Sequence, residues 1–138
     1  MGFGWDKVVL GRTQLRVSRL GIGSSFGLEP HDLAFALDRG INYFYWGSIR
    51  REQYGRGIRD LARSRRDEMV VVVQSYTRAA FWMERSLDSA LRRLGLDHAD
   101  VLLLGWWNQP PPPRILDAAL ALVEKGKARH LMVSCHHR

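Results

Sequence analysis

The sequence is poor in cysteine, in long apolar runs and in acidic side chains. Cys135 is the single cysteine among 138 residues, which excludes an internal disulfide. No apolar run reaches the roughly 18–20 residues that a membrane-spanning helix needs. The first seven residues, MGFGWDK, lack the charged-then-apolar order of a signal peptide. We therefore expect one domain over residues 1–138, in the cytoplasm and without a membrane partner.

The scarcity of acids leaves the chain basic. Its 21 lysines and arginines outnumber its 14 aspartates and glutamates, for a formal net charge of +7. Such a charge is compatible with nucleic-acid binding, but the arginines are dispersed along the chain. Arg56, Arg59 and Arg63 follow steps of three and four residues, as on the solvated face of a helix. We therefore expect no nucleic-acid partner.

What the sequence does have is a set of short, strongly apolar segments. Residues 69–75 (MVVVVQS) and 100–107 (DVLLLGWW) show no polar alternation, which is typical of strands buried on both faces in a parallel sheet. Together with the shorter apolar segments, they predict five strands, over residues 20–25, 41–46, 69–75, 100–107 and 130–134.

Helical segments separate these strands. Pro30 stands near the start and Gly40 at the end of a helix over 31–40. Further helices are predicted over about 52–62, 80–93 and 114–124. In residues 8–20, apolar and polar residues alternate on either side of a Gly-Arg-Thr turn, which is typical of a β-hairpin. Strand and helix thus alternate in units of parallel α/β structure, five strands and four helices after the hairpin. An open doubly wound sheet and a closed (β/α) barrel both obey this order.

Four segments, taken in order, resemble the aldo-keto reductase family. They are LGRTQLRVSRLGIGSSFG, ALDRGINYFYWG, SLDSALRRLGLDHADVLLLGWW and PPPPRILDAALALVEKGKARHLMVS. The resemblance implies an α/β fold that forms the N-terminal part of a (β/α)8 TIM barrel, incomplete at the C-terminus. It also implies NADP or NAD as cofactor and hydride transfer to a carbonyl.

The family's catalytic residues are an aspartate, a tyrosine, a lysine and a histidine at strand ends. The resemblance places these positions on Tyr45, Arg50, Ser75 and Gly105, so all four are substituted. Arg50 stays protonated and cannot shuttle protons, and a phenol with a pKa of about 10 needs a nearby cation to act as an acid. We therefore expect a pseudo-enzyme or binding scaffold rather than a carbonyl reductase.

The cofactor positions are also incomplete. In the family, the phosphates of the cofactor are held after the seventh and eighth strands, and this chain stops after the fifth. Ser134 matches a serine that contacts the nicotinamide, but Cys135 replaces the asparagine that follows it. We expect no cofactor to bind this chain, with NADP implied by resemblance alone.

Aromatic residues gather where the strands end, at the rim that barrel proteins use for ligands. One interpretation is a pocket for a flat or cationic small molecule, and the other is that aromatic rings fill a lost catalytic cavity. Cys135, His136 and His137 are adjacent, so their side chains alternate in direction and predict no metal site. The expected ligand rim comprises Tyr45, Trp46, Tyr76, Trp106, Trp107 and Asn108.

Five parallel strands do not close a barrel, so strands one and five would be edges with unpaired backbone groups. We expect a second copy or another chain to cover them, in which case the chain could act as a protein-interaction module. An alternative is an oxidoreductase or other barrel enzyme with a non-standard site that uses Tyr45, Arg50 and Trp106.

Overall fold

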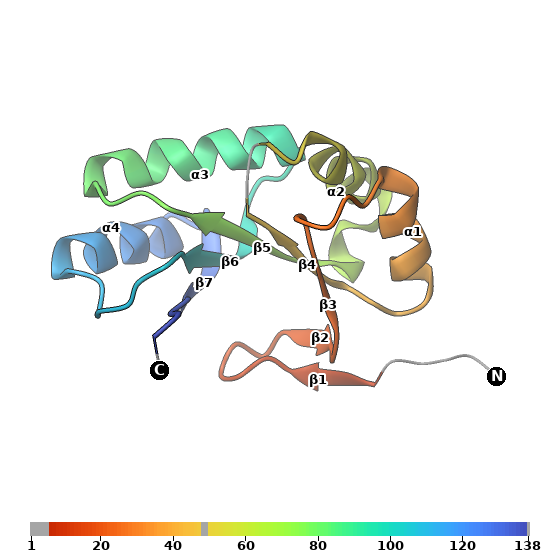
Figure 1. Ribbon diagram of the computed structural model, residues 1–138, viewed down its shortest axis with the longest axis horizontal. Helices are drawn as coiled ribbons and strands as arrows, with labels where there is room; N and C mark the ends of the chain where they lie inside the picture. The colour runs from red at the N-terminus through yellow and green to blue at the C-terminus, as the bar shows by residue number, and fades with distance from the viewer. Residues whose placement is uncertain (1–5, 48–49, 138) are drawn as a thin grey trace.

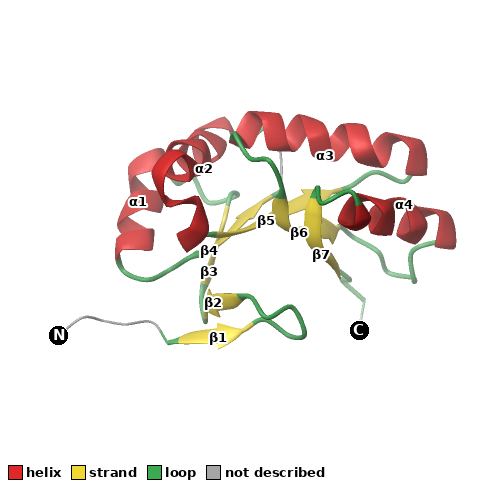
Figure 2. Ribbon diagram, turned by 180° about the vertical axis from the view of Figure 1, so that it is seen from behind, coloured by secondary structure: helices red, strands yellow, loops and turns green. Residues whose placement is uncertain are grey.

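A computed structural model describes residues 6–47 and 50–137. Within these residues, an antiparallel hairpin of β1 (Lys7–Val9) and β2 (Arg16–Ser18) precedes a parallel sheet whose five strands lie side by side in chain order, with the four α-helices on one face (Figures 1 and 2). The strands are β3 (Gly21–Gly23), β4 (Tyr43–Trp46), β5 (Val70–Ser75), β6 (Ala99–Leu104) and β7 (Ala128–Val133). A doubly wound sheet would reverse its strand order at a switch point, so this sequential order identifies a partial barrel.

The helices confirm the predicted alternation, with shifted ends. They are α1 (Pro30–Asp38), α2 (Glu52–Arg65), α3 (Ala80–Leu94) and α4 (Pro113–Glu124). Helix α2 is longer than the predicted 52–62, because residues 63–65 continue it, and a 3-10 turn, η1 (Arg66–Glu68), follows. Strand β6 is shorter than predicted and ends at Leu104. Trp106 has a left-handed backbone with φ of 58°, which an extended strand does not allow.

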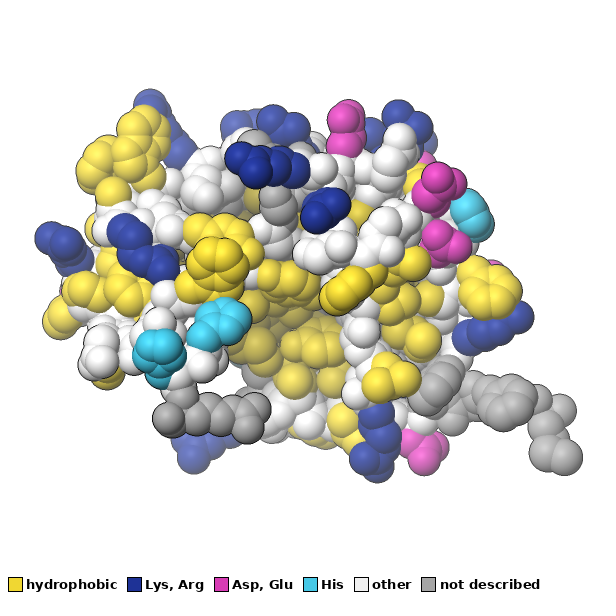
Figure 3. All heavy atoms as spheres, viewed as in Figure 1, with side chains coloured by type: hydrophobic (Ala, Val, Ile, Leu, Met, Phe, Trp, Pro, Cys, Tyr) yellow, Lys and Arg dark blue, Asp and Glu magenta, His cyan; other side chains and the backbone are white. Residues whose placement is uncertain are grey.

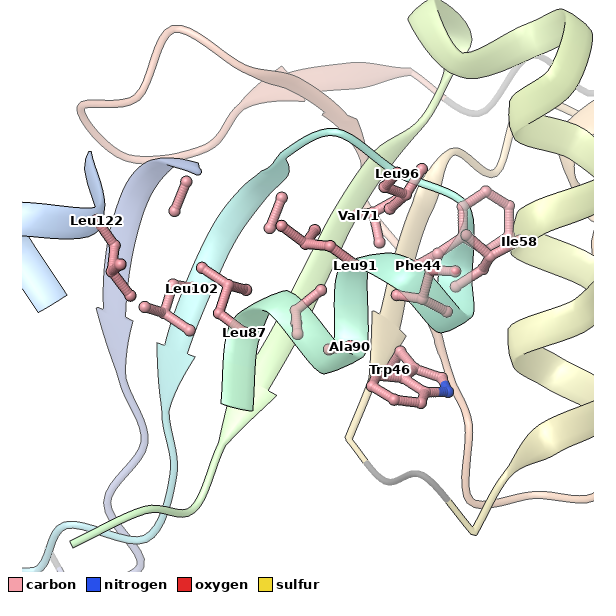
Figure 4. Packing of buried hydrophobic residues seen from close by; sticks show 14 of the residues in the cluster. Phe44, Trp46, Ile58, Val71, Leu87, Ala90, Leu91, Leu96, Leu102 and Leu122 are labelled. Carbon is pink, nitrogen blue, oxygen red and sulfur yellow. The ribbon is translucent and has the colours of Figure 1, made fainter. Parts of the chain in front are cut away.

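The two faces of the sheet have different neighbours. Alternate residues of β4, β5 and β6 point toward the helices and form the main apolar core, as Figure 4 shows for Phe44, Val71 and Leu102. The opposite face is concave and would be the interior of a closed barrel. The side chains that occupy it follow from the strand register and are those of Tyr43, Tyr45, Val70, Val72, Gln74, Val101, Leu103, His130 and Met132.

Buried polar groups hold the end of the sheet at which the strands begin. The side chain of Asn42 accepts the backbone N–H of Ser18 at 2.8 Å and donates to the carbonyl of Arg16 at 3.0 Å, which fastens the hairpin to β4. Asp100 accepts the backbone N–H of Val71 at 2.8 Å and pairs with Arg66 at 3.0 Å. This end of a barrel serves stability, so any ligand site is expected at the opposite end.

Among the helices of the described residues, none combines the length and the apolar character that crossing a bilayer demands.

Candidate functional site

The candidate site lies on the concave face where β4, β5 and β6 end. The register pairs Tyr45 with Val72 and Gln74 with Leu103, so Tyr45, Gln74 and the residue after β6 on this face, Gly105, point the same way. We call these three positions, with Tyr76, the mouth. Gln74 was not among the residues predicted from the sequence.

Gln74 fills the space that a side chain at position 105 would need. A Cβ atom added to Gly105 would lie 1.8 Å from Nε2 and 2.8 Å from Cδ of Gln74. The side chain of Gln74 is buried, and its Oε1 accepts a hydrogen bond from the hydroxyl of Tyr76 at 3.0 Å. The close packing against this amide therefore leaves room for no side chain at position 105, and glycine fits there.

Tyr45 is a neutral phenol in this arrangement. Burial raises its pKa above the ordinary tyrosine value, and a hydrogen bond to Tyr76 raises the pKa further. Since the proton of the Tyr76 hydroxyl goes to Gln74, Tyr45 is the donor to Tyr76. A chain of hydrogen bonds thus runs from Tyr45 through Tyr76 to Gln74. The raised pKa keeps Tyr45 protonated, and the amide of Gln74 carries no charge.

Ser75 does not lie in the mouth. It is 3% exposed and points toward the helices, because residues 74 and 75 face opposite sides of the sheet. The mouth position on β5 is Gln74. The placement of the family's lysine position at Ser75 is therefore corrected by one residue.

Two of the tryptophans expected at the rim also lie on the helix side. Trp46 is 3% exposed and belongs to the core between β4 and the helices (Figure 4). Trp107 is half-buried against the same core, and the guanidinium of Arg78 stacks on its ring at 4.0 Å. Both residues behave as packing aromatics rather than as rim residues.

The exposed part of the rim contains Tyr76, Trp106 and His136. The rings of Tyr76 and Trp106 meet edge to face with centroids 5.1 Å apart, and His136 meets Trp106 in the same way at 5.8 Å. Asn108 accepts the backbone N–H of His136 at 3.1 Å, which holds this segment against the loop after β6. His136 was missed because only this loop contact brings it to the rim.

Arg78 is a cation in direct contact with the mouth. Its guanidinium donates to the carbonyls of Gly105 at 2.9 Å and Trp106 at 2.8 Å, which explains how the left-handed turn after β6 is held. No sequence pattern predicts this role, since the partners are backbone carbonyls. Arg78 therefore supports the rim structurally.

Arg50 lies elsewhere. It lines a hollow of about 200 Å³ beside the loop after β3, together with Leu28 and Tyr54. The hydroxyl of Tyr54 donates to the carbonyl of Ile22 at 2.5 Å, so Tyr54 packs as a core residue. The structure does not bring Arg50 to the rim at Trp106.

Ser134 and Cys135 are engaged locally. The hydroxyl oxygen of Ser134 accepts the backbone N–H of Trp106 at 2.9 Å, and the thiol of Cys135 donates to the carbonyl of His137 at 2.8 Å. Over residues 6–47 and 50–137, no three histidine, cysteine or acidic side chains converge as metal ligands would.

Solved structures share this fold. An aldo-keto reductase from Bacillus halodurans, in its holo form, superposes with a TM-score of 0.84 at 21% identity, over 96% of this chain and 51% of that one. An aldo-keto reductase from Klebsiella pneumoniae, in complex with NADPH, superposes with a TM-score of 0.80 at 26% identity, over 93% of this chain and 49% of that one. The chain therefore spans about half the length of these proteins.

The sequence comparisons agree with the fold. L-galactose dehydrogenase from Arabidopsis thaliana is 33% identical, over 67% of this chain and 35% of that protein. A sequence model described as "Aldo/keto reductase family" matches residues 28–137, which is most of the chain. The match contains every strand of the parallel sheet except β3, along with the mouth and the rim. The chain belongs to the aldo/keto reductase family.

Proposed function

We propose that this chain is an aldo-keto-reductase-like domain that does not catalyse the family's carbonyl reduction and instead binds a small flat or cationic molecule at its rim. The observation that carries the proposal is the neutral hydrogen-bonded chain from Tyr45 through Tyr76 to Gln74, next to Gly105. Carbonyl reduction needs an acid that releases a proton as the alkoxide forms.

Tyr45 is poorly suited to that step, because its pKa is raised where a catalytic phenol needs a lowered one. Gln74 and Gly105 cannot supply an ammonium or an imidazole. The guanidinium of Arg78 points at backbone carbonyls. Loss of members of a cooperative catalytic set costs orders of magnitude in rate, and here several are replaced at once.

The same positions argue against a nicotinamide cofactor. The Klebsiella pneumoniae structure contains NADPH, so a bound cofactor is the default expectation for a relative. In this chain Ser134 accepts the N–H of Trp106, and Cys135, whose thiol donates to the carbonyl of His137, stands where the family has the asparagine that follows this serine. We therefore propose that the chain binds no nicotinamide, and we assign no hydride-transfer step to it.

Two measurements test this proposal. We expect tryptophan fluorescence to show no saturable quenching by micromolar NADPH, and we expect no aldehyde-dependent NADPH oxidation. An active aldo-keto reductase in the same assays is the positive control. Saturable quenching together with aldehyde turnover would instead support the alternative of a barrel enzyme with a non-standard site.

Binding at the rim is tested with 1-methylpyridinium, a flat cation. We expect saturable quenching that Trp106→Ala abolishes, because the ring of Trp106 is exposed beside Tyr76. Trp82→Ala is the matched control, since Trp82 is also exposed but lies on α3. Linear quenching that is equal in both variants would contradict a rim site and favour rings that merely fill space.

A second candidate function is association through the open sheet. Within the described residues, β3 and β7 each pair with one neighbouring strand only, so each has an unpaired edge. Figure 3 shows hydrophobic side chains at the bottom of a hollow on the concave face of the sheet. We propose that a second copy or a partner chain covers it. Light scattering on the purified chain is expected to show an assembly, and a clean monomer of 15.9 kDa would rule out self-association.

We also propose a cytoplasmic location. Cys135 is an exposed free thiol, which is typical of a reducing compartment. Cell fractionation that recovers the chain outside the cytoplasm would contradict this.

A further inference from the structure

A second hollow lies on the outer side of the sheet, between α2 and α3. Its volume is about 80 Å³, and its lining comes from the end of β4, from α2 and from the last turn of α3. It is separated from the concave mouth by the sheet itself, because Trp46 and Tyr45 face opposite sides. The lining residues are Trp46, Glu52, Gly55, Arg56, Arg59 and Arg93.

The indole of Trp46 presents an unused donor to this hollow. Trp46 is 3% exposed, and its Nε1 has no hydrogen-bond partner among the described residues. A buried N–H without an acceptor is unfavourable and rare, so its presence points to an acceptor from outside the chain. Figure 4 shows the nitrogen on the side of α2.

Gly55 is what opens the N–H to the hollow. A Cβ atom at this position would lie 3.2 Å from Nε1 of Trp46 and 3.4 Å from Cδ2 of Leu94. Glycine in a helix interior is otherwise unfavourable relative to alanine. The missing side chain leaves the space next to the indole nitrogen clear.

Three arginines surround the same space. In the described part of the chain, Arg56, Arg59 and Arg93 form no ion pair of the kind that Arg65 makes with Asp38 and Glu68. The aliphatic part of the Arg59 side chain packs against Gly95, where an added Cβ atom would lie 2.8 Å from Cγ of Arg59. This packing holds the side chain of Arg59 in its direction toward the hollow. One carboxylate, Glu52, also lines the hollow, which leaves the lining with two excess positive charges.

We propose that this hollow binds a phosphate group, either as inorganic phosphate or as the phosphoryl group of a small metabolite. Guanidinium groups match phosphate oxygens with paired N–H donors, and the indole N–H of Trp46 supplies one further donor from the floor of the site. A volume of about 80 Å³ holds a few water-sized groups, enough for one tetrahedral anion and too small for a nucleotide base. Any remainder of a phosphoryl ligand would extend into solvent.

The indole N–H signals of the folded chain provide the test. In a 1H,15N correlation spectrum each of the five tryptophans gives one indole signal, and Trp46→Phe identifies that of Trp46. We expect inorganic phosphate to shift this signal saturably, and chloride at equal ionic strength to leave it in place. Unchanged signals from the other four tryptophans show that the fold is intact.

Variants separate the parts of the site. Arg59→Gln and Arg93→Gln are each expected to weaken phosphate binding at least tenfold, since hydrogen bonds to charged groups are the strong ones. Arg92→Gln removes the same charge from α3 at a residue that does not line the hollow, and binding should not change. Gly55→Ala keeps every arginine but covers the indole N–H, so it should abolish the shift of Trp46.

Several results would overturn the proposal. One is a Trp46 signal that phosphate does not move. Another is an equal loss of binding in Arg92→Gln and Arg93→Gln, which would indicate general attraction to a basic surface. Equal binding of acetate would exclude selectivity for phosphate. Tighter binding of glycerol phosphate than of inorganic phosphate would identify a phosphoryl metabolite, and the reverse order would identify the free ion.

Discussion

Substitution of Gly105 by alanine is expected to destabilise the fold strongly, although the change adds a single methyl group. The new Cβ would lie 1.8 Å from Nε2 of Gln74, far inside van der Waals contact. Gln74 must therefore leave its position and lose the hydrogen bond from Tyr76. Overpacking of this kind costs about 1–3 kcal/mol and a lost hydrogen bond about 1 kcal/mol, so we expect the free energy of unfolding to fall by about 2–4 kcal/mol.

A double-mutant cycle tests the cause. Gln74→Ala removes the Nε2 and Cδ atoms with which the new methyl group collides, at a cost of about 1–2 kcal/mol in lost packing and hydrogen bonding. In that background Gly105→Ala should cost less than about 1 kcal/mol, which corresponds to a coupling energy of about 2 kcal/mol. Urea unfolding followed by circular dichroism supplies each free energy.

Gly23→Ala is the matched control. It adds the same methyl group on the same face of the sheet, but the nearest atoms would be 3.5 Å away, an ordinary contact. We expect a change within about 0.5 kcal/mol. If Gly105→Ala and Gln74→Ala proved additive, or if Gly105→Ala behaved as Gly23→Ala does, the claim that Gln74 occupies the space above Gly105 would be refuted.

Three further predictions follow from the same geometry. Ser75→Lys buries an ammonium under the helices and should cost several kcal/mol in urea unfolding, whereas Gln74→Lys reaches the mouth and should cost clearly less; equal costs would contradict the assignment of faces. Tyr54→Phe leaves the partly buried carbonyl of Ile22 without this donor and should cost about 1–2 kcal/mol in the same assay, and an unchanged stability would contradict a stabilising role for this bond. Burial raises the pKa of Tyr43, Tyr45 and Tyr54 in the folded state, so the folded chain keeps protons that the unfolded chain loses above about pH 10. Stability should then be fully present below that pH and fall as the pH rises further, and phenolate absorbance that shows every tyrosine titrating at its ordinary pKa would contradict this.

The fold was largely predictable from the sequence, because its signals are local. Runs such as 69–75 predict a buried strand from composition alone, and Gly95 ends α3 in the left-handed conformation that glycine favours. The choice between an open sheet and a barrel was not local. It depends on which strands are neighbours, which periodicity does not contain; the family resemblance predicted the barrel, and the sequential strand order confirms it.

The site was harder to predict for a physical reason. In a strand where polar and apolar residues alternate, the polar residues mark one face of the sheet. The run Val70–Val73 is apolar throughout, so its sequence does not show which residues lie on which face. A shift of one residue then moves a side chain to the opposite face, which is how Ser75 was expected where Gln74 lies. The same ambiguity placed Trp46 at the rim. The contacts of Arg78 with backbone carbonyls could not be predicted, because every residue has a carbonyl whatever its type.

We propose that the family's catalytic positions are substituted in this chain, and the hydrogen bonds in the mouth give a reason for these positions to differ together. An aspartate, a lysine and a histidine at neighbouring strand ends compensate each other's charge, and a buried polar network that is only partly satisfied costs more than an uncharged one. Here the replacement set is complete in itself, since Tyr45 donates to Tyr76, Tyr76 donates to Gln74, and Gly105 makes room for the amide. Reintroducing one charged residue would leave it without a partner of opposite sign in the described mouth. On our proposal that the chain does not reduce carbonyls, a gain of that activity would require several of these positions to change at once.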